Sequence, residues 1–166
     1  MNNIKIGLIT VSDRSSRGER EDLSGPELRK WCKKMNFTVS EELVIPDEFD
    51  IIKNSLIELS DRGMDLILTT GGTGFAPRDR TPEATRAVIE KEAPGFAEVM
   101  RMRSLQITHH AMLSRAVSGI RKKTLIINLP GSPKGAIENI EFIEKALPHA
   151  LKLLRNEVKD CADEKE

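Results

Sequence analysis

The chain of 166 residues contains no tyrosine and a single tryptophan. Proteins that hold single-stranded nucleic acid stack its bases on aromatic side chains, so this shortage argues against a base-stacking platform. Basic residues and acidic residues number 26 each, which gives a formal net charge of zero. No overall field would therefore draw the chain onto nucleic acid or onto a membrane surface, and we expect neither as a partner.

Long apolar segments and cysteine clusters are also missing. The opening MNNIKIGLIT has one lysine and a short apolar run, which suits neither a secretory signal nor a membrane span. The only cysteines, Cys32 and Cys161, lack metal-ligand spacing, and the three histidines form no ligand pattern. We therefore expect a cytoplasmic protein whose cysteines stay reduced.

What is present is the composition of a globular protein, with 31% charged and 39% hydrophobic residues. A chain of this length suits one compact domain with a core that needs neither disulfides nor metals. We predict a single domain over residues 1–158. Residues 159–166 are almost all charged or small, and we predict a disordered tail there.

Hydrophobic periodicity indicates strands that alternate with helices. Runs of β-branched and aliphatic residues predict strands at 4–11, 37–45 and 65–70. Apolar residues at three- and four-residue spacing predict helices at 24–35, 51–59, 82–90, 96–105 and 137–151. Thr81 before Pro82 is expected to cap its helix. Segments 116–121 and 124–128 form either a hairpin or two successive strands. The pattern predicts a three-layer α/β sandwich with a mainly parallel sheet.

Ligands of such folds bind beyond the carboxyl ends of the strands, where this chain concentrates its glycine, proline and hydroxyl residues. In TTGGTGFAPRD, which begins at Thr69, the glycines allow backbone N–H groups to approach a phosphate, and threonines add hydroxyls. A second loop, PGS at residues 130–132, follows another apolar strand. No Gly-Lys-Ser/Thr sequence indicates a P-loop, so each loop alone could also be a tight turn.

Asp47 and Asp79 each follow a strand and should reach the same edge of the sheet. Two carboxylates would repel a polyphosphate unless a divalent cation lay between them. Magnesium favours one or two carboxylates together with substrate phosphates, so a metal-dependent phosphate-handling site is one interpretation. Asp79 could instead be a solvated carboxylate at a helix start. Ser114 and the polar loop at residues 12–17 could likewise provide only caps and surface charge.

Several of these segments together resemble the MogA/MoaB-type molybdopterin adenylyltransferases, a family that includes the G domain of gephyrin. The resemblance rests on TTGGTGFAPRDRTPEAT, PGFAEVMR, AMLSRAVSGIR and LIINLPGSPKGA, and on the opening IGLITVSDRSSRGEREDLSGPEL and IPDE. It runs in order from about residue 4 to about residue 154. Arg80 stands where many relatives have valine, and Ser132 where several have Asn or Gln.

The resemblance implies a molybdenum-cofactor-binding (MogA-like) fold, a homotrimer, and transfer of AMP from Mg-ATP to molybdopterin with release of pyrophosphate. A molybdenum insertase would receive the product. Asp47 and Asp79 are the implied catalytic residues and Mg²⁺ ligands, directly or through water. The implied nucleotide-binding residues are Gly71, Gly72, Thr73, Gly74, Pro130, Gly131 and Ser132. The implied molybdopterin-binding residues are Ser12, Asp13, Arg17 and Ser114. A non-catalytic molybdopterin or nucleotide carrier of the same fold is the alternative.

Overall fold

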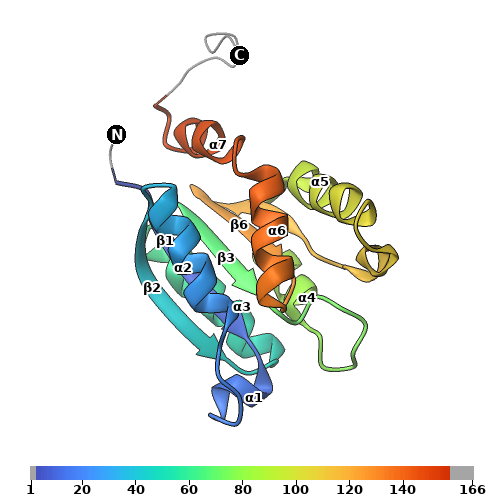
Figure 1. Ribbon diagram of the computed structural model, residues 1–166. Helices are drawn as coiled ribbons and strands as arrows, with labels where there is room; N and C mark the ends of the chain where they lie inside the picture. The colour runs from blue at the N-terminus through green and yellow to red at the C-terminus, as the bar shows by residue number, and fades with distance from the viewer. Residues whose placement is uncertain (1–2, 158–166) are drawn as a thin grey trace.

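The computed structural model describes residues 3–157, and the predicted tail at 159–166 lies outside them. A six-stranded sheet in the order β2-β1-β3-β6-β5-β4 forms its centre (Figure 1). Four neighbouring strands run parallel, namely β2 (Thr38–Ile45), β1 (Lys5–Val11), β3 (Leu66–Thr70) and β6 (Thr124–Leu129). Next to β6, β5 (Ser118–Arg121) pairs antiparallel with it, and β4 (Lys91–Glu92) in turn pairs antiparallel with β5. The predicted α/β fold with a mainly parallel sheet is confirmed.

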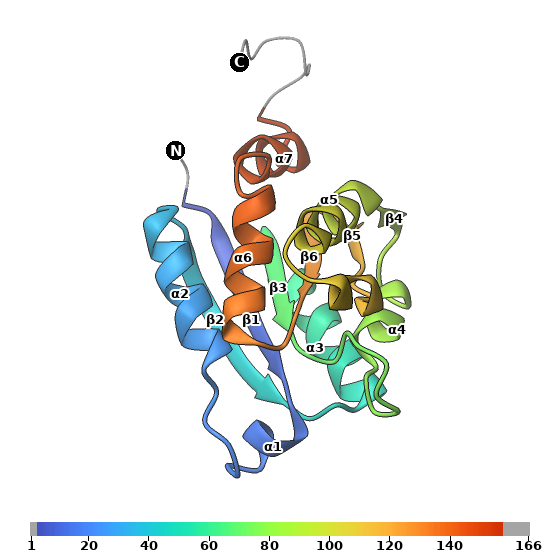
Figure 2. The same ribbon diagram turned by 45° about the vertical axis from the view of Figure 1, so that its right-hand side comes forward.

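Helices cover both faces of the sheet (Figures 1 and 2). One face packs against α2 (Ser24–Lys34), α5 (Pro94–Leu105), α6 (Pro133–Ile143) and α7 (Leu147–Leu154). The other packs against α3 (Phe49–Asp61) and α4 (Thr81–Arg86). Short turns of helix lie in two loops, α1 (Asp13–Ser16) and the 3-10 segment η1 (His109–Leu113).

Side chains of the central strands alternate between the two faces of the sheet and form two hydrophobic cores. In β3, Leu66 and Leu68 join the cluster beneath α2 and α6, whereas Ile67 joins the cluster beneath α3. Successive side chains of a strand point to opposite faces, and a parallel strand with helices on both sides is apolar throughout. All residues of β3 and β6 are buried. This rigid centre ends at one edge, where the polar loops begin.

Several predicted boundaries need correction. The predicted helix 137–151 is two helices, because Pro148 in the first turn of α7 has no N–H to continue the ladder of α6. The helix predicted at 82–90 ends at Arg86, since the Glu90 amide donates to the Ile120 carbonyl at 2.8 Å and the chain enters the sheet as β4. That two-residue strand was not predicted.

Thr81 is not the cap of α4 but its first residue. Its hydroxyl donates to the Gly71 carbonyl at 2.9 Å, and Arg80 precedes it without a side-chain capping bond. The alternatives left open for residues 116–128 resolve as a hairpin, in which Lys122 at the turn has φ of 54°. The division into a 1–158 domain and a tail stays a prediction.

Candidate active site

The loops after β1 and β2 are joined by a reciprocal pair of hydrogen bonds. The Asp13 amide donates to Asp47 Oδ2 at 2.9 Å, and the Asp47 amide donates to Asp13 Oδ1 at 3.1 Å. Parallel strands bring their carboxyl ends to one edge, so two aspartates far apart in sequence meet there. The exchange fixes both carboxylates beside the site.

Arg78 distinguishes these two aspartates. Its guanidinium donates to both oxygens of Asp13, at 2.6 and 2.9 Å, and to Glu48 at 2.7 Å. The hydrogen bonds from Arg78 hold the pKa of the Asp13 carboxyl below its usual value. Asp47 has no such ion pair among residues 3–157, and burial raises its pKa, with the charges of Asp13 and Asp79 adding to the effect. Asp47 therefore lacks an ion pair of its own, and the Asp13 amide and the charge of Arg78 offset the rise in its pKa only in part.

Two glycines in the loop after β3 leave room for the carboxylates of Asp47 and Asp79. Gly72, with φ of +64°, faces Asp47, and a Cβ there would lie 3.1 Å from Asp47 Oδ1 and 2.4 Å from the Thr81 hydroxyl. A Cβ on Gly74 would lie 2.9 Å from Asp79 Oδ2. Asp79 Oδ2 in turn accepts the Ala76 amide at 3.0 Å. The structure thus brings Asp47 and Asp79 to the same stretch of backbone.

That backbone has hydrogen-bonding capacity to spare. Across the described part of the chain, no acceptor is recorded for the amides of Gly72, Thr73 and Gly74, whereas the Gly71 amide donates to Leu129 at 3.2 Å. Successive N–H groups in such a turn form an anion-binding concavity. The same loop therefore presents donors suited to phosphate oxygens and two carboxylates suited to a cation.

The second predicted loop, at residues 130–132, packs directly on the first. The Pro130 carbonyl accepts the Thr70 hydroxyl at 2.7 Å, and the Gly131 carbonyl accepts the Ser24 hydroxyl at 2.9 Å. A Cβ on Gly131 would lie 3.2 Å from the Gly71 Cα, so a side chain there would move the two loops apart by a few tenths of an ångström. Ser132 caps α6 by accepting the Gly135 amide at 3.1 Å. All seven predicted nucleotide-binding residues lie in these two touching loops.

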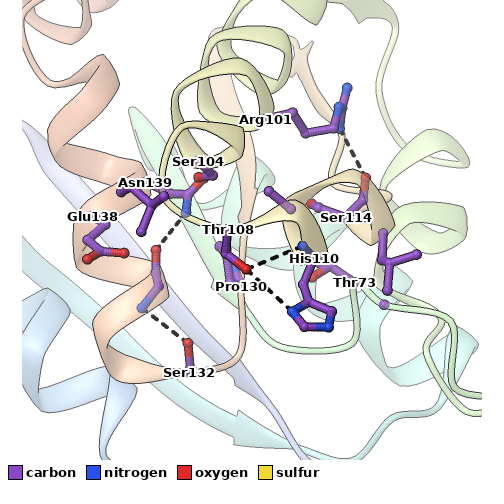
Figure 3. Close-up of a pocket in the computed structure, with 15 residues that line it drawn as sticks. Thr73, Arg101, Ser104, Thr108, His110, Ser114, Pro130, Ser132, Glu138 and Asn139 are labelled. Atoms are coloured by element: carbon purple, nitrogen blue, oxygen red, sulfur yellow. Dashed lines mark hydrogen bonds between the residues drawn. The ribbon is translucent and has the colours of Figure 1, made fainter.

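A pocket of about 310 Å³ opens beside the two loops (Figure 3). Ser132, Glu138 and Asn139 of the α6 side face Thr73, Ser114 and Arg101 across it, with Thr108 and His110 between. Ile107 and Leu113 add apolar surface. Ligand pockets combine such apolar walls with a few placed polar groups.

The four predicted molybdopterin-binding residues do not share one hollow. Ser114 lines the 310 Å³ pocket, whereas Ser12 lines a second hollow of about 50 Å³ with Gly131. The loop at residues 130–132 borders both hollows. Arg17 lines neither and is paired with Glu19, and the Asp13 carboxylate is occupied by Arg78. The roles of these residues toward a ligand stay predictions.

Sequence reasoning passed over several polar residues of the site. Arg101 donates to the Ala116 carbonyl at 2.9 Å and so holds the segment that carries Ser114. Asn139 donates to the Gly135 carbonyl at 2.8 Å, and its oxygen accepts the Ser104 hydroxyl at 3.3 Å. Asn139 interrupts the apolar stripe of α6, and a polar residue inside such a stripe is the signal that could have found it.

The carboxylates fit a magnesium ion that is shared with phosphates rather than a metal cage. Within residues 3–157, no group of three or more His, Cys, Asp or Glu side chains could hold a metal. Asp47 and Asp79 lie beside one loop, and Asp47 has no ion pair of its own there. This matches the preference of magnesium for one or two carboxylates plus substrate oxygens.

Within residues 3–157, no helix is long and apolar enough to cross a membrane.

Comparisons with known proteins identify the family of the chain. The model of the probable molybdopterin binding domain matches residues 7–149. The chain is 46% identical over 157 residues to a molybdopterin adenylyltransferase of Helicobacter pylori strain J99, covering 93% of this chain and 89% of that protein. It is 48% identical over 149 residues to the molybdopterin adenylyltransferase of Escherichia coli K12, covering 88% and 76%.

The fold agrees as well. The crystal structure of the molybdopterin biosynthesis enzyme MoaB from Thermus thermophilus superposes with a TM-score of 0.88 at 51% identity, covering 92% of this chain and 97% of that one. The family match spans all the strand-end loops described above. The chain therefore belongs to the family of molybdopterin-binding domains of molybdenum cofactor biosynthesis.

Proposed function

We propose that this chain is a molybdopterin adenylyltransferase, which transfers AMP from Mg-ATP to the terminal phosphate of molybdopterin and releases pyrophosphate. The observation that carries the proposal is the loop after β3, where free backbone amides lie between the carboxylates of Asp47 and Asp79. Relatives at 46% and 48% identity carry the name of this activity. A binding protein would need the amides but has no evident use for two closely placed carboxylates.

The proposed chemistry is positioning and charge neutralisation. Amides of Gly72, Thr73 and Gly74 donate to phosphate oxygens of the nucleotide, and the Gly131 contact holds the second loop against them. A bound Mg²⁺ would supply the positive charge between Asp47, Asp79 and the polyphosphate. Asp47 and Asp79 need no proton to play this part, and no covalent enzyme intermediate is required because one phosphate oxygen attacks directly.

We assign molybdopterin to the 310 Å³ pocket, where Ser114 and Ser132 face each other. That volume lies at the lower end of the range of small-molecule pockets, whereas the 50 Å³ hollow at Ser12 could hold only part of such a ligand. The pocket and the glycine loop share Thr73 and Gly74, so an acceptor in the pocket would lie next to a nucleotide on the loop.

The proposal also includes the oligomeric state of the enzyme, its location in the cell and the protein that receives its product. We infer a homotrimer, supported by exposed apolar side chains at Met102, Leu105 and Ile107 that a monomer leaves in water. A cytoplasmic setting would supply the ATP. A molybdenum insertase would receive adenylyl-molybdopterin, because the product is activated for a further step. Light scattering coupled to gel filtration tests the trimer directly.

The deciding experiment incubates the purified chain with molybdopterin, ATP and Mg²⁺ and separates the products by chromatography. Adenylyl-molybdopterin and pyrophosphate should appear only when both ATP and magnesium are present. Omission of magnesium, with EDTA added, is the matched control. Tight binding of molybdopterin without any adenylylated product would contradict the proposal and favour the carrier alternative.

A further inference from the structure

Arg115, between η1 and β5, holds both ends of the segment that carries Asp79. Its Nε donates to the Gly74 carbonyl at 2.7 Å, and its Nη2 donates to the Asp79 carbonyl at 3.0 Å. Its own backbone amide donates to the Thr73 carbonyl at 2.9 Å. One residue, distant in sequence, therefore closes residues 74–79 into a loop with a fixed base.

The remaining side of the guanidinium is held by Glu83 in the first turn of α4. Arg115 Nη1 forms an ion pair with one Glu83 oxygen, and the other oxygen is buried without a hydrogen-bond partner among the described residues. An ion pair on one side and two carbonyls on the other leave the guanidinium little freedom to turn. Each of its three nitrogens donates to a protein acceptor, so the orientation of the Arg115 guanidinium is set by the protein.

Closure at the base determines where the Asp79 carboxylate lies. Residues 75–78 at the tip of the loop are exposed, and within the loop Asp79 Oδ2 accepts the Ala76 amide at 3.0 Å. That contact keeps the carboxylate beside Gly74 only while both ends of the segment stay in place. An exposed loop without such a clamp would sample many conformations.

Only arginine satisfies this arrangement. Its planar fork carries donors at fixed angles, which can reach two carbonyls and a carboxylate together. A lysine ammonium would keep the charge that Glu83 needs, but it is a point donor on a flexible stem and would not hold both carbonyls. Lysine at this position therefore separates the clamp from the ion pair.

We propose that Arg115 is a positioning residue, which fixes the Asp79 carboxylate against the glycine loop by clamping the carbonyls of Gly74 and Asp79. The inference rests on the proposed adenylyl transfer for its catalytic consequence, although the clamp itself is a property of the free protein. Its loss misplaces Asp79 without removing it.

The test compares Arg115→Lys with a matched control, Arg155→Lys. Arg155 also uses a fork, on both oxygens of Asp65 and on the Asn3 carbonyl, but at the opposite edge of the sheet. For Arg115→Lys we expect kcat to fall by about 10- to 100-fold, while KM for ATP changes by less than about threefold. Arg155→Lys should keep the wild-type kcat at 25 °C.

Hydrogen exchange of the free protein supplies a readout that needs no turnover. The Ala76 and Asp79 amides, which are bonded within the loop, should exchange about tenfold faster in Arg115→Lys and at the wild-type rate in Arg155→Lys. Wild-type exchange and wild-type kcat in Arg115→Lys would overturn the inference, as would equal losses of kcat in both variants. Faster loop exchange, in a chain that proves unable to transfer AMP at all, would support the clamp while the proposed function fails.

Discussion

Asp65 and Asp47 lie at opposite edges of the parallel sheet and differ in whether a cation is paired with them. At the amino end of β3, both oxygens of Asp65 accept from Arg155 at 2.6 Å, and Asp65 Oδ2 also accepts the Lys5 amide at 2.8 Å. At the carboxyl ends, Asp47 accepts the Asp13 amide and no other donor of residues 3–157, and burial raises its pKa. Asp65 has its counter-charge built into the fold, whereas Asp47 lies next to the paired Asp13 without an ion pair of its own in residues 3–157.

This difference separates stability from function within one sheet. A carboxylate with its partner built in strengthens the fold, and a carboxylate without one weakens it unless a ligand supplies the missing charge. The site edge is therefore where substitutions should change turnover most, and the opposite edge is where they should change the free energy of unfolding. Four experiments test that division.

The largest effect is expected for Asp79→Asn. An asparagine oxygen can still accept the Ala76 amide, so the loop keeps its shape while a charge for the cation is lost. We expect kcat to fall by about 10²- to 10³-fold, the range seen when one electrostatic group is removed from a transition state. Product formation followed by chromatography measures the loss, and a thermal midpoint near wild type shows that the fold is kept. Full activity would remove Asp79 from the mechanism.

The opposite edge should give the complementary result in Asp65→Asn. The change removes the negative charge that Arg155 Nε and Nη2 both contact, so the guanidinium, whose side chain is only 17% exposed, keeps the Glu157 carboxylate at 3.5 Å but loses that of Asp65. We expect the free energy of unfolding to fall by about 1–3 kcal/mol, with kcat unchanged at 25 °C. Urea denaturation and the chromatographic assay measure the two quantities on the same preparation. A loss of kcat without a loss of stability would refute the division between edges.

A smaller effect is expected on KM for molybdopterin, and it differs between two residues at the carboxyl edge of the sheet. Ser114 faces the 310 Å³ pocket, whereas Arg17 lies outside it and pairs with Glu19 in solvent. Ser114→Ala should raise KM for molybdopterin by about fivefold to tenfold, the loss of one hydrogen bond, and Arg17→Ala should leave it within about twofold. Initial rates at varied molybdopterin decide between them, and the reverse order would contradict the assignment of molybdopterin to the pocket at Ser114.

The smallest expected change is a gain of stability in Asp47→Asn. The amide keeps an acceptor for the Asp13 amide but removes a buried charge, so we expect stabilisation by up to about 1 kcal/mol at neutral pH. The folded-state pKa of Asp47 is raised above the unfolded value of about 3.9. The carboxyl is protonated in both states below that value, so its charge lowers stability only at higher pH. The advantage over wild type should close as the pH falls through the raised pKa.

Thermal midpoints of the two proteins between pH 4 and pH 8, measured with EDTA present, test this sign. An advantage that grows toward acid pH would contradict a raised pKa for Asp47.

The meeting of Asp47 and Asp79 could be predicted from the sequence, because both follow strands whose carboxyl ends share one edge. The contacts from arginines that hold this site together could not be predicted. Arg78 binds Asp13 across 65 positions of sequence, and Arg115 reaches Gly74 across 41. Many cations in the chain could have made these contacts, and only the packing of the loops selects among them.

The elements themselves show the same limit. Central strands such as β3 were predicted because a run buried on both faces is apolar throughout. The two-residue β4 has no periodicity and exists only because β5 offers it an edge. The break between α6 and α7 depends on Pro148, and an amphipathic stripe that continues across it concealed the break.

The sheet order also has a consequence for biosynthesis. The partner of β3 on one side is β6, although α4, β4, α5, η1 and β5 lie between them in the chain. A growing polypeptide therefore carries its entire glycine loop well before Leu129, which accepts the Gly71 amide, or Arg115 has been made. At about 5–20 residues per second, that interval lasts several seconds. A nascent chain should therefore be unable to bind nucleotide until Leu129 has left the ribosome.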